Sequence, residues 1–357
     1  MRTVIVLASS VASVAIASAC ASSEGEAVVP ADPPAPVQDG GDAGRGSVAD
    51  AAVPATPLEC SPAGWCRTGF PDEDLVFRDI APFEELAFAI AESASEGIKV
   101  LEWTKSTNRW AYVDDGSQNV IGLGTFAGRI YAPNVDEVYF TVGPSHVFHG
   151  KRSGGAWTWT NQSLPDNIAG HTDTHGNPIE LASDRPIATL GVWGTGEGDV
   201  YAYYGNTIFR LDAATRTFAA VYVADDLEAA DEHVFFTSAH GSGPDDVWFV
   251  GARERASYGC PLVVRKSAAG WARVADAVVS DSNDAPCAER PGTLYVGGAG
   301  RSGWLVDVAR VTSTEYVALY NRAQGSSLED VYTTTIRVTS DGYSFEQSLV
   351  PVSIADI

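Results

Sequence analysis

The sequence predicts an all-β protein, a five-bladed β-propeller built from four-stranded antiparallel blades. Two observations predict this fold. A phrase that joins an acidic turn to alternating large apolar residues occurs five times, and a hairpin with an aromatic residue on its return strand follows each phrase. The composition agrees, because 35 Gly, 13 Tyr, 13 Phe and 9 Trp beside a single Met favour sheets and tight turns over helix bundles.

The chain before the repeats is expected to be an export signal and a tether. Residues 1–19 have one early Arg, an apolar run and small residues that lead into Cys20, which is typical of a signal peptide. The run is too short to span a bilayer as a stable helix. Residues 20–58 are rich in Ala, Pro, Gly and Asp and contain no aromatic residue, so we expect a disordered linker. The folded domain is therefore expected over residues 59–357.

Each repeat is expected to form one blade. Extending the phrase in both directions gives four short strands about every 55 residues, which is typical of a propeller blade. A single blade cannot bury both faces of its sheet, so a ring of blades supplies the core. A β-sandwich is the alternative, but it would not explain why the turn and the aromatic residue return together. The expected blades are 75–113, 128–160, 187–221, 235–275 and 303–350.

Two sets of residues recur with the repeat. The aromatic residues of the return strands are expected to be buried between blades, and they are Trp110, Trp157, Phe218, Trp271 and Phe345. The acidic residues of the turns are expected to accept backbone N–H bonds, and they are Glu85, Asp136, Asp199, Asp246 and Glu315. A calcium role is the alternative for these acids, but no turn has the alternating Asp/Asn ligands of a calcium loop.

Charge and motifs exclude several functions. The formal net charge of −23 leaves no basic stripe for nucleic acid and argues against electrostatic binding to anionic lipid. No Gly-x-Ser-x-Gly elbow, phosphate loop or His-Glu-x-x-His motif is present. Only Asp79 and Asp307 are expected on inner strands, too few for the paired carboxylates of glycoside hydrolysis. We therefore expect a non-catalytic protein without a cofactor.

Loop lengths predict the functional face. The second-to-third-strand loops and the links between blades share one face of a propeller, and they hold the long insertions, at 160–187, 222–233, 251–261, 275–303 and 321–330. The loop at 252–259 offers Arg253, Arg255 and Tyr258 as a binding surface for an acidic or sugar partner. The alternative is that these residues are merely solvated.

The cysteines support this face. An exported protein with four cysteines beyond Cys20 is expected to form disulfides, and the blade assignment predicts the pairs Cys60–Cys66 and Cys260–Cys287. A zinc site is the alternative. A disulfide at 260–287 would tie the 252–259 loop to the next insertion.

A histidine-rich loop is the second candidate on this face. His171, Asp173 and His175 offer two imidazoles and a carboxylate, which are metal-ligand types. Without an evident fourth ligand, we favour their interpretation as solvated polar residues that belong to the binding face. No metal is expected.

Several motifs resemble known families. The "ASAC" of residues 17–20 resembles the lipobox of bacterial lipoproteins, although Ala17 stands where the family has Leu. That resemblance implies that Cys20 carries the lipid anchor, and Ala21 in place of Asp implies the outer membrane. Ordinary secretion with cleavage near Ala19 or Ala21 is the alternative.

Within the domain, "RLDAATRTF" (210–218) resembles the Asp-x-x-Thr turn of quinoprotein-type repeats, and "TSDGYSF" (339–345) resembles an Asp-box hairpin. The "GRIYAP" of residues 128–133 is similar to the Arg-Ile-Pro motif of sialidase-like propellers, with two intruding residues. As a whole the chain resembles the propeller lipoproteins of myxobacteria. This implies an exported outer-membrane lipoprotein that acts as a binding or scaffold module for a protein or glycan. A glycan-processing propeller enzyme is the alternative.

Overall fold

The computed structural model describes residues 67–120, 126–167, 172, 175–176, 178, 190–255, 258–280, 286–296, 303–324, 327–339 and 342–349. All of them belong to one compact unit, Arg67–Ile357. The predicted signal peptide, the linker, and Cys20, Cys60 and Cys66 lie outside the described residues. Among the described residues, no helix is long and apolar enough to cross a membrane.

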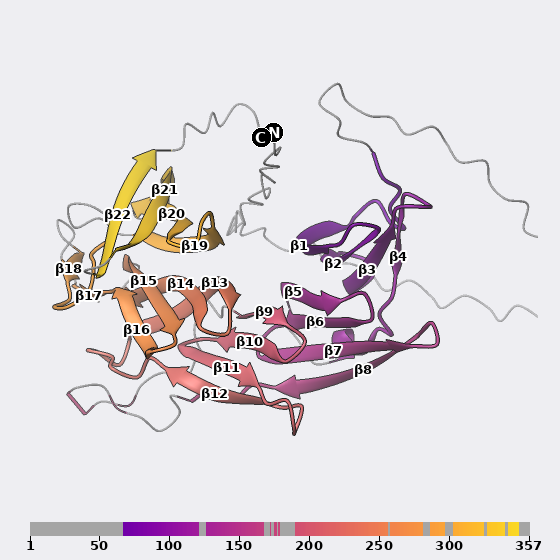
Figure 1. The fold of residues 1–357 in the computed structure, drawn as a ribbon, viewed down its shortest axis with the longest axis horizontal. Helices are drawn as coiled ribbons and strands as arrows, with labels where there is room; N and C mark the ends of the chain where they lie inside the picture. Colours follow the sequence, from indigo (N-terminus) through magenta and orange to yellow (C-terminus); the bar gives the residue numbers. More distant parts are fainter. Residues whose placement is uncertain are drawn as a thin grey trace, which may run out of the picture. The chain divides into compact units, whose positions relative to one another are not determined.

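The described chain forms five four-stranded antiparallel sheets, and each is a meander in chain order (Figure 1). Sheet 1 contains β1 (Val76–Pro82), β2 (Leu86–Ser93), β3 (Gly97–Thr104) and β4 (Arg109–Tyr112). Sheet 2 contains β5 (Ala127–Asn134), β6 (Glu137–Val142), β7 (His146–Ser153) and β8 (Ala156–Ser163). Sheet 3 contains β9 (Leu190–Gly196), β10 (Asp199–Tyr204), β11 (Thr207–Leu211) and β12 (Phe218–Val223).

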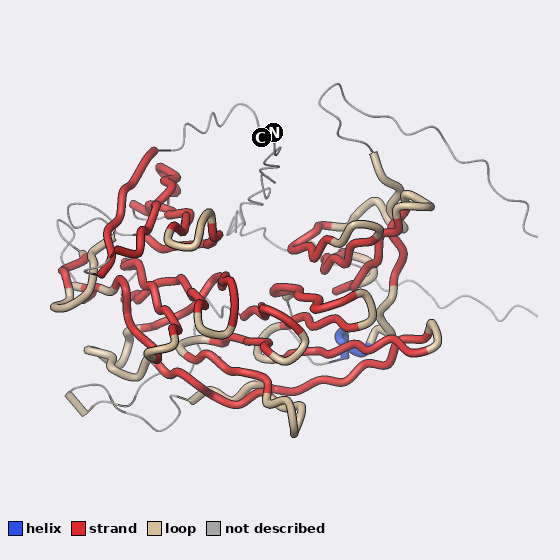
Figure 2. Tube along the Cα trace, viewed as in Figure 1, coloured by secondary structure: helices blue, strands red, loops and turns tan. Residues whose placement is uncertain are grey.

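Sheet 4 contains β13 (His233–Gly243), β14 (Asp246–Arg255), β15 (Tyr258–Ser267) and β16 (Gly270–Ala275). Sheet 5 contains β19 (Gly303–Arg310), β20 (Glu315–Gln324), β21 (Ser327–Thr339) and β22 (Gly342–Leu349). Between them lie a small hairpin, β17 (Ala277–Val279) with β18 (Cys287–Glu289), and a 3-10 turn at Ser117–Val120 follows sheet 1. Strands dominate the described chain (Figure 2), so the all-β class and the four-stranded sheets are confirmed.

The first strands of consecutive sheets lie next to one another, from β1 through β5, β9 and β13 to β19. Hydrogen bonds join them: Asp79 Oδ2 accepts the Ile130 N–H at 3.0 Å, and the Thr237 hydroxyl donates to the Leu305 carbonyl at 2.6 Å. Within the described residues, no strand pairing joins sheet 5 to sheet 1. A closed five-bladed ring therefore stays a prediction.

The core consists of apolar clusters between neighbouring sheets. Four of the repeated aromatic residues pack against these clusters, as predicted, namely Trp157, Phe218, Trp271 and Phe345. Trp110 differs, because it packs with residues of sheet 1 itself, 5.1 Å from the Phe77 ring. The prediction of an inter-sheet position for Trp110 is wrong in this structure. The main chain at Gly69 pairs with β4, the edge strand of sheet 1, since the Trp110 N–H donates to the Gly69 carbonyl at 2.9 Å.

The acidic residue of each repeated phrase pairs with a base on the third strand or, for Lys105, directly after it. Antiparallel pairing puts the start of the second strand opposite the end of the third, so the two side chains meet across the sheet. Among the described residues, none of these acids accepts a backbone N–H bond from its turn as predicted; Asp199 and Asp246 instead accept hydroxyl bonds across the turn, from Thr195 at 2.6 Å and from Ser242 at 2.7 Å. The five pairs and their N–O distances are Glu85–Lys105 (2.8 Å), Asp136–Arg152 (2.9 Å), Asp199–Arg210 (2.8 Å), Asp246–Arg265 (3.2 Å) and Glu315–Arg337 (3.9 Å).

Candidate functional site

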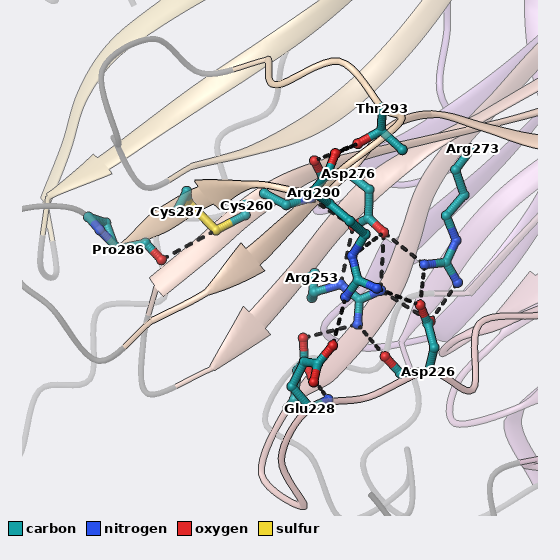
Figure 3. Close-up of polar contacts among 12 residues, drawn as sticks. Asp226, Glu228, Arg253, Cys260, Arg273, Asp276, Pro286, Cys287, Arg290 and Thr293 are labelled. Atoms are coloured by element: carbon teal, nitrogen blue, oxygen red, sulfur yellow. Dashed lines mark hydrogen bonds and ion pairs between the residues drawn. A yellow bond between two sulfur atoms is a disulfide. The ribbon is translucent and has the colours of Figure 1, made fainter. Parts of the chain in front are cut away.

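A disulfide braces the connection that follows sheet 4. Cys260 of β15 and Cys287 of β18 are joined, with a Cα–Cα distance of 5.8 Å, which confirms the predicted pair. Both sulfur-bearing residues are buried in a small cluster with Ala277 and Val279. The hairpin between sheets 4 and 5 is thereby fixed to the edge of β15 (Figure 3).

The segment predicted as a loop at 252–259 is largely strand. β14 continues to Arg255 and β15 begins at Tyr258, with Arg253 paired to Cys260 in the antiparallel register. The alternation of side chains along "ARER" lets β14 extend to Arg255, because every second residue can face the protein. This extension carries Arg253 inward and not outward.

Arg253 was expected on the binding surface, and this expectation is wrong. Its side chain is 0% exposed. All five guanidinium N–H donors are used inside the protein (Figure 3): Nε and Nη2 donate to Asp276, Nη1 donates to Glu232 and to the Asp226 carbonyl, and Nη2 also donates to the Asp226 carboxylate, at 3.0–3.3 Å. No donor remains for a partner.

Arg253 is the centre of an ionic network, here called the arginine cluster, in which Arg253, Glu232 and Asp276 are buried and Asp226, Glu228, Arg273 and Arg290 are partly exposed. Arg273 Nη1 lies 2.8 Å from Asp276 Oδ2, and Arg290 Nη1 lies 2.9 Å from Asp226 Oδ2. Three guanidinium groups face four carboxylates, so the charges of the cluster are nearly balanced.

The cluster perturbs the titration of its members. Burial disfavours the charged form of Asp226, but the three guanidinium groups outweigh this effect and lower its pKa to about 2. Burial likewise disfavours the charged form of Arg253, yet Asp276 and Glu232 raise its pKa above the usual arginine value. The cluster ties the connection at 224–232 and the connection at 276–290 to β14 and β16 of sheet 4.

The residues that remain at the surface form a smaller site, here called the platform, which comprises Arg255, Tyr258 and Tyr295. The two half-buried tyrosines pack against the cluster around the disulfide. Arg255 Nε lies 2.9 Å from Asp231 Oδ1, and both side chains are partly exposed. Tyrosine rings on a fixed support offer a flat apolar face with a polar tip, which suits protein or sugar ligands.

Of the three residues predicted for the histidine-rich loop, the structure describes one. His171 and Asp173 lie outside the described residues, whereas His175 is described and exposed. Within the described ranges, no group of three or more His, Cys, Asp or Glu side chains is arranged to hold a metal ion. The metal hypothesis for this loop therefore gains no support from the described part of the chain.

A second polar group lies on the first strands of the sheets and on β10, and the sequence analysis named only its two aspartates and the segment that contains Arg129. This inner-strand cluster comprises Asp79, Arg129, Tyr203, Ser238 and Asp307. Arg129 Nη1 lies 3.8 Å from Asp79 Oδ1, and the Ser238 hydroxyl donates to Asp307 Oδ1 at 2.5 Å. Burial raises the pKa of Asp79, Arg129 opposes this effect, and the charge of Asp307 adds to it.

The inner-strand cluster arises from irregular strand pairing. The register shifts between Phe77 and Asp79 and again between Leu305 and Asp307, and β5 and β13 shift at comparable places. A bulge changes the direction in which a side chain points. It is hard to recognise from the alternation of apolar and polar residues in the sequence. The two aspartates and the "GRIYAP" segment that contains Arg129 were named from the sequence, but the contact of Arg129 with Asp79 was not predicted.

Comparisons with known proteins identify no family. No family model matches the chain, and no curated protein matches it. Among solved structures, the extracellular domain of BT4673 from B. thetaiotaomicron matches with a TM-score of 0.35 and 7% identity, over 76% of this chain and 40% of that one. AofleA from Arthrobotrys oligospora matches with a TM-score of 0.36 and 13% identity, over 78% of this chain and 87% of that one. This chain therefore spans less than half of the first of these proteins, and neither likeness bears on function.

Proposed function

We propose that the protein is an exported, lipid-anchored β-propeller that acts as a non-catalytic binding or scaffold module on the cell envelope. In this proposal Cys20 carries the lipid in the outer membrane, residues 20–58 are the tether, and the five sheets close into one ring. The ligand is a protein or a glycan, and it binds at the platform formed by Arg255, Tyr258 and Tyr295.

One observation supports the binding role most strongly, namely the bracing beneath the platform. The Cys260–Cys287 disulfide fixes the hairpin that follows sheet 4, and the arginine cluster fixes the connections on both sides of that sheet. A surface that is ordered before binding loses less entropy when a ligand binds, so such bracing favours affinity. Half-buried tyrosines and arginine are also the residue types that dominate binding hot spots.

The binding role is tested with the full-length protein on a glycan array and by cross-linking in intact cells. The Y258A/Y295A protein should lose at least tenfold in affinity for the ligand found, as hot-spot tyrosines do. R255A, which changes the third platform residue, should also weaken binding, and R337A is its matched control, because Arg337 also forms an ion pair at the surface, with Glu346 at 3.1 Å. Equal binding by wild type and Y258A/Y295A would move the site elsewhere.

The anchor is tested separately. Metabolic labelling with palmitate should mark the wild-type protein and leave the C20S protein unlabelled. If the C20S protein partitions into membranes as the wild type does, the lipid-anchor proposal fails while the binding proposal stands.

One observation favours a glycan-processing enzyme as the second candidate. Asp79 has a raised pKa and stands within electrostatic reach of Asp307, with Arg129 beside it. Glycosidases need one protonated and one ionised carboxyl group at the same site. Release of sugar by the wild type that D79N and D307N both abolish would establish this activity.

A further inference from the structure

A turn of sheet 3 carries a cationic side chain to sheet 2. The turn between β11 and β12 is closed by Asp212, whose Oδ1 accepts the N–H groups of Ala214 and Thr215 at 2.9 and 2.7 Å. Arg216 follows with φ of 58°, a left-handed conformation that favours glycine. The chain thus keeps a long charged residue where glycine would fit the backbone with less strain.

Side chains of sheet 2 hold one end of the Arg216 guanidinium. Its Nη2 donates to Glu137 Oε1 and to the Tyr139 hydroxyl, both at 2.5 Å. Glu137 is buried, and it also lies 2.9 Å from His149 Nε2. The His149 ring is stacked on Tyr139 with 4.5 Å between centroids. Nη2 is therefore fixed by groups that are themselves packed.

The remainder of the guanidinium faces outward. The Arg216 side chain is 41% exposed, and within the described residues Nε and Nη1 have no hydrogen-bond partner. These atoms carry three of the five N–H donors of arginine. Lys151 of β7 is exposed and adds a second positive charge. This charge helps to lower the pKa of His149. Donors that are fixed in place beside a second cation are suited to a carboxylate.

We propose that Arg216 and Lys151 bind the carboxylate group of a ligand between sheets 2 and 3, at a site separate from the platform. Glu137 and Tyr139 position the guanidinium, and Lys151 supplies long-range attraction. The protein's net charge of −23 opposes anions in general, so the local cations must provide the affinity. The carboxylate belongs either to an acidic sugar or to the end of a peptide.

The site also has a built-in pH dependence. The charged groups that face His149 are Glu137 of β6, Lys151 of β7 and Arg216 of the turn. Burial lowers the pKa of His149, Glu137 opposes this effect, and Arg216 and Lys151 add to it. Protonation of His149 adds a positive charge beside the site. Carboxylate affinity therefore rises as the pH falls below the usual histidine range.

The proposal is tested by ligand-observed NMR titration of the full-length protein. One arm compares glucuronate with neutral glucose, and the other compares N-acetyl-dialanine with its amide. At least one acid should bind at millimolar concentration while its neutral partner does not, and the arm that responds identifies the source of the carboxylate. R216Q should weaken binding about tenfold or more, as the loss of charge-assisted hydrogen bonds does. R337Q, which removes an exposed arginine of sheet 5, should bind as the wild type.

Two further variants separate binding from folding. K151Q removes a charge with no ion-pair partner among the described residues, so it should fold normally and bind severalfold more weakly. H149Q should keep binding near neutral pH and lose the rise at lower pH. The proposal is overturned if neither acid binds, or if R216Q and a normally folded K151Q both bind as the wild type does. Both of these outcomes would leave the proposal of ligand binding at the platform unaffected.

Discussion

The buried position of Arg253 makes a quantitative prediction about stability. R253M keeps most of the side-chain volume and removes the charge with all five N–H donors. Asp276 and Glu232, which are 0% and 1% exposed, then lose a cation that each contacts. Removing one partner from a buried ion pair costs about 3–5 kcal/mol, because the other charge stays buried and unpaired. Asp276 keeps Arg273 and Arg290, so most of the loss falls on Glu232.

The assay is equilibrium urea denaturation with the disulfide intact, followed by tryptophan fluorescence. R255M is the matched control, because Arg255 lies two residues away on the same strand and pairs with the exposed Asp231. An exposed pair contributes about 0–1 kcal/mol, so R255M should unfold nearly as the wild type does. R253K keeps the charge but has fewer N–H donors, so its unfolding free energy should lie between those of R253M and R255M. If R253M loses under about 1 kcal/mol, the arginine cluster does not support the fold as argued.

Four other predictions address the fold. Replacing Cys260 and Cys287 by serine should destabilise the protein by about 3.5 kcal/mol in thermal or urea unfolding, the chain-entropy value for a separation of 27 residues. F218A should cost about 3–5 kcal/mol in the same assay, because this buried ring lies between two sheets, and a cost near zero would contradict the packing. Asp226 has a folded pKa of about 2 against an ordinary 3.8, so its contribution is present above pH 3.8 and is lost as the pH falls toward 2. In a pH series, D226N should therefore flatten the acid limb of the stability curve, and a limb that matches the wild type would contradict this. K105A removes an exposed partner of Glu85 and should change the unfolding free energy by less than about 1 kcal/mol.

The fold class followed from the sequence because the repeat signals are local. Alternating side chains, a polar turn and an aromatic return strand each depend on a few neighbouring residues, and five copies reinforce one another. Trp110 was misplaced because its environment depends on which segment covers sheet 1. That segment, which includes Gly69, carries no repeat signal.

The site was less predictable because burial of a charged residue depends on distant partners. Arg253 resembles a surface residue in "ARER", and its three acidic partners lie 21 to 27 positions away along the chain. Arg129 and Arg216 lie in the quoted segments "GRIYAP" and "RLDAATRTF", but their partners were not predicted for the same reason, since each pairs with an acid of another sheet. The Cys260–Cys287 pair was predictable, because the repeat fixed where both connections lie.

The central claim is that the braced platform of sheet 4 binds a ligand of the cell envelope. The most direct test measures saturable binding of the full-length protein to an envelope fraction from its own source, comparing wild type, Y258A/Y295A and R337A. We predict that wild type and R337A bind equally and that Y258A/Y295A loses at least tenfold in affinity while it keeps a cooperative urea unfolding transition and the wild-type circular-dichroism spectrum. Undiminished binding by Y258A/Y295A would contradict the account.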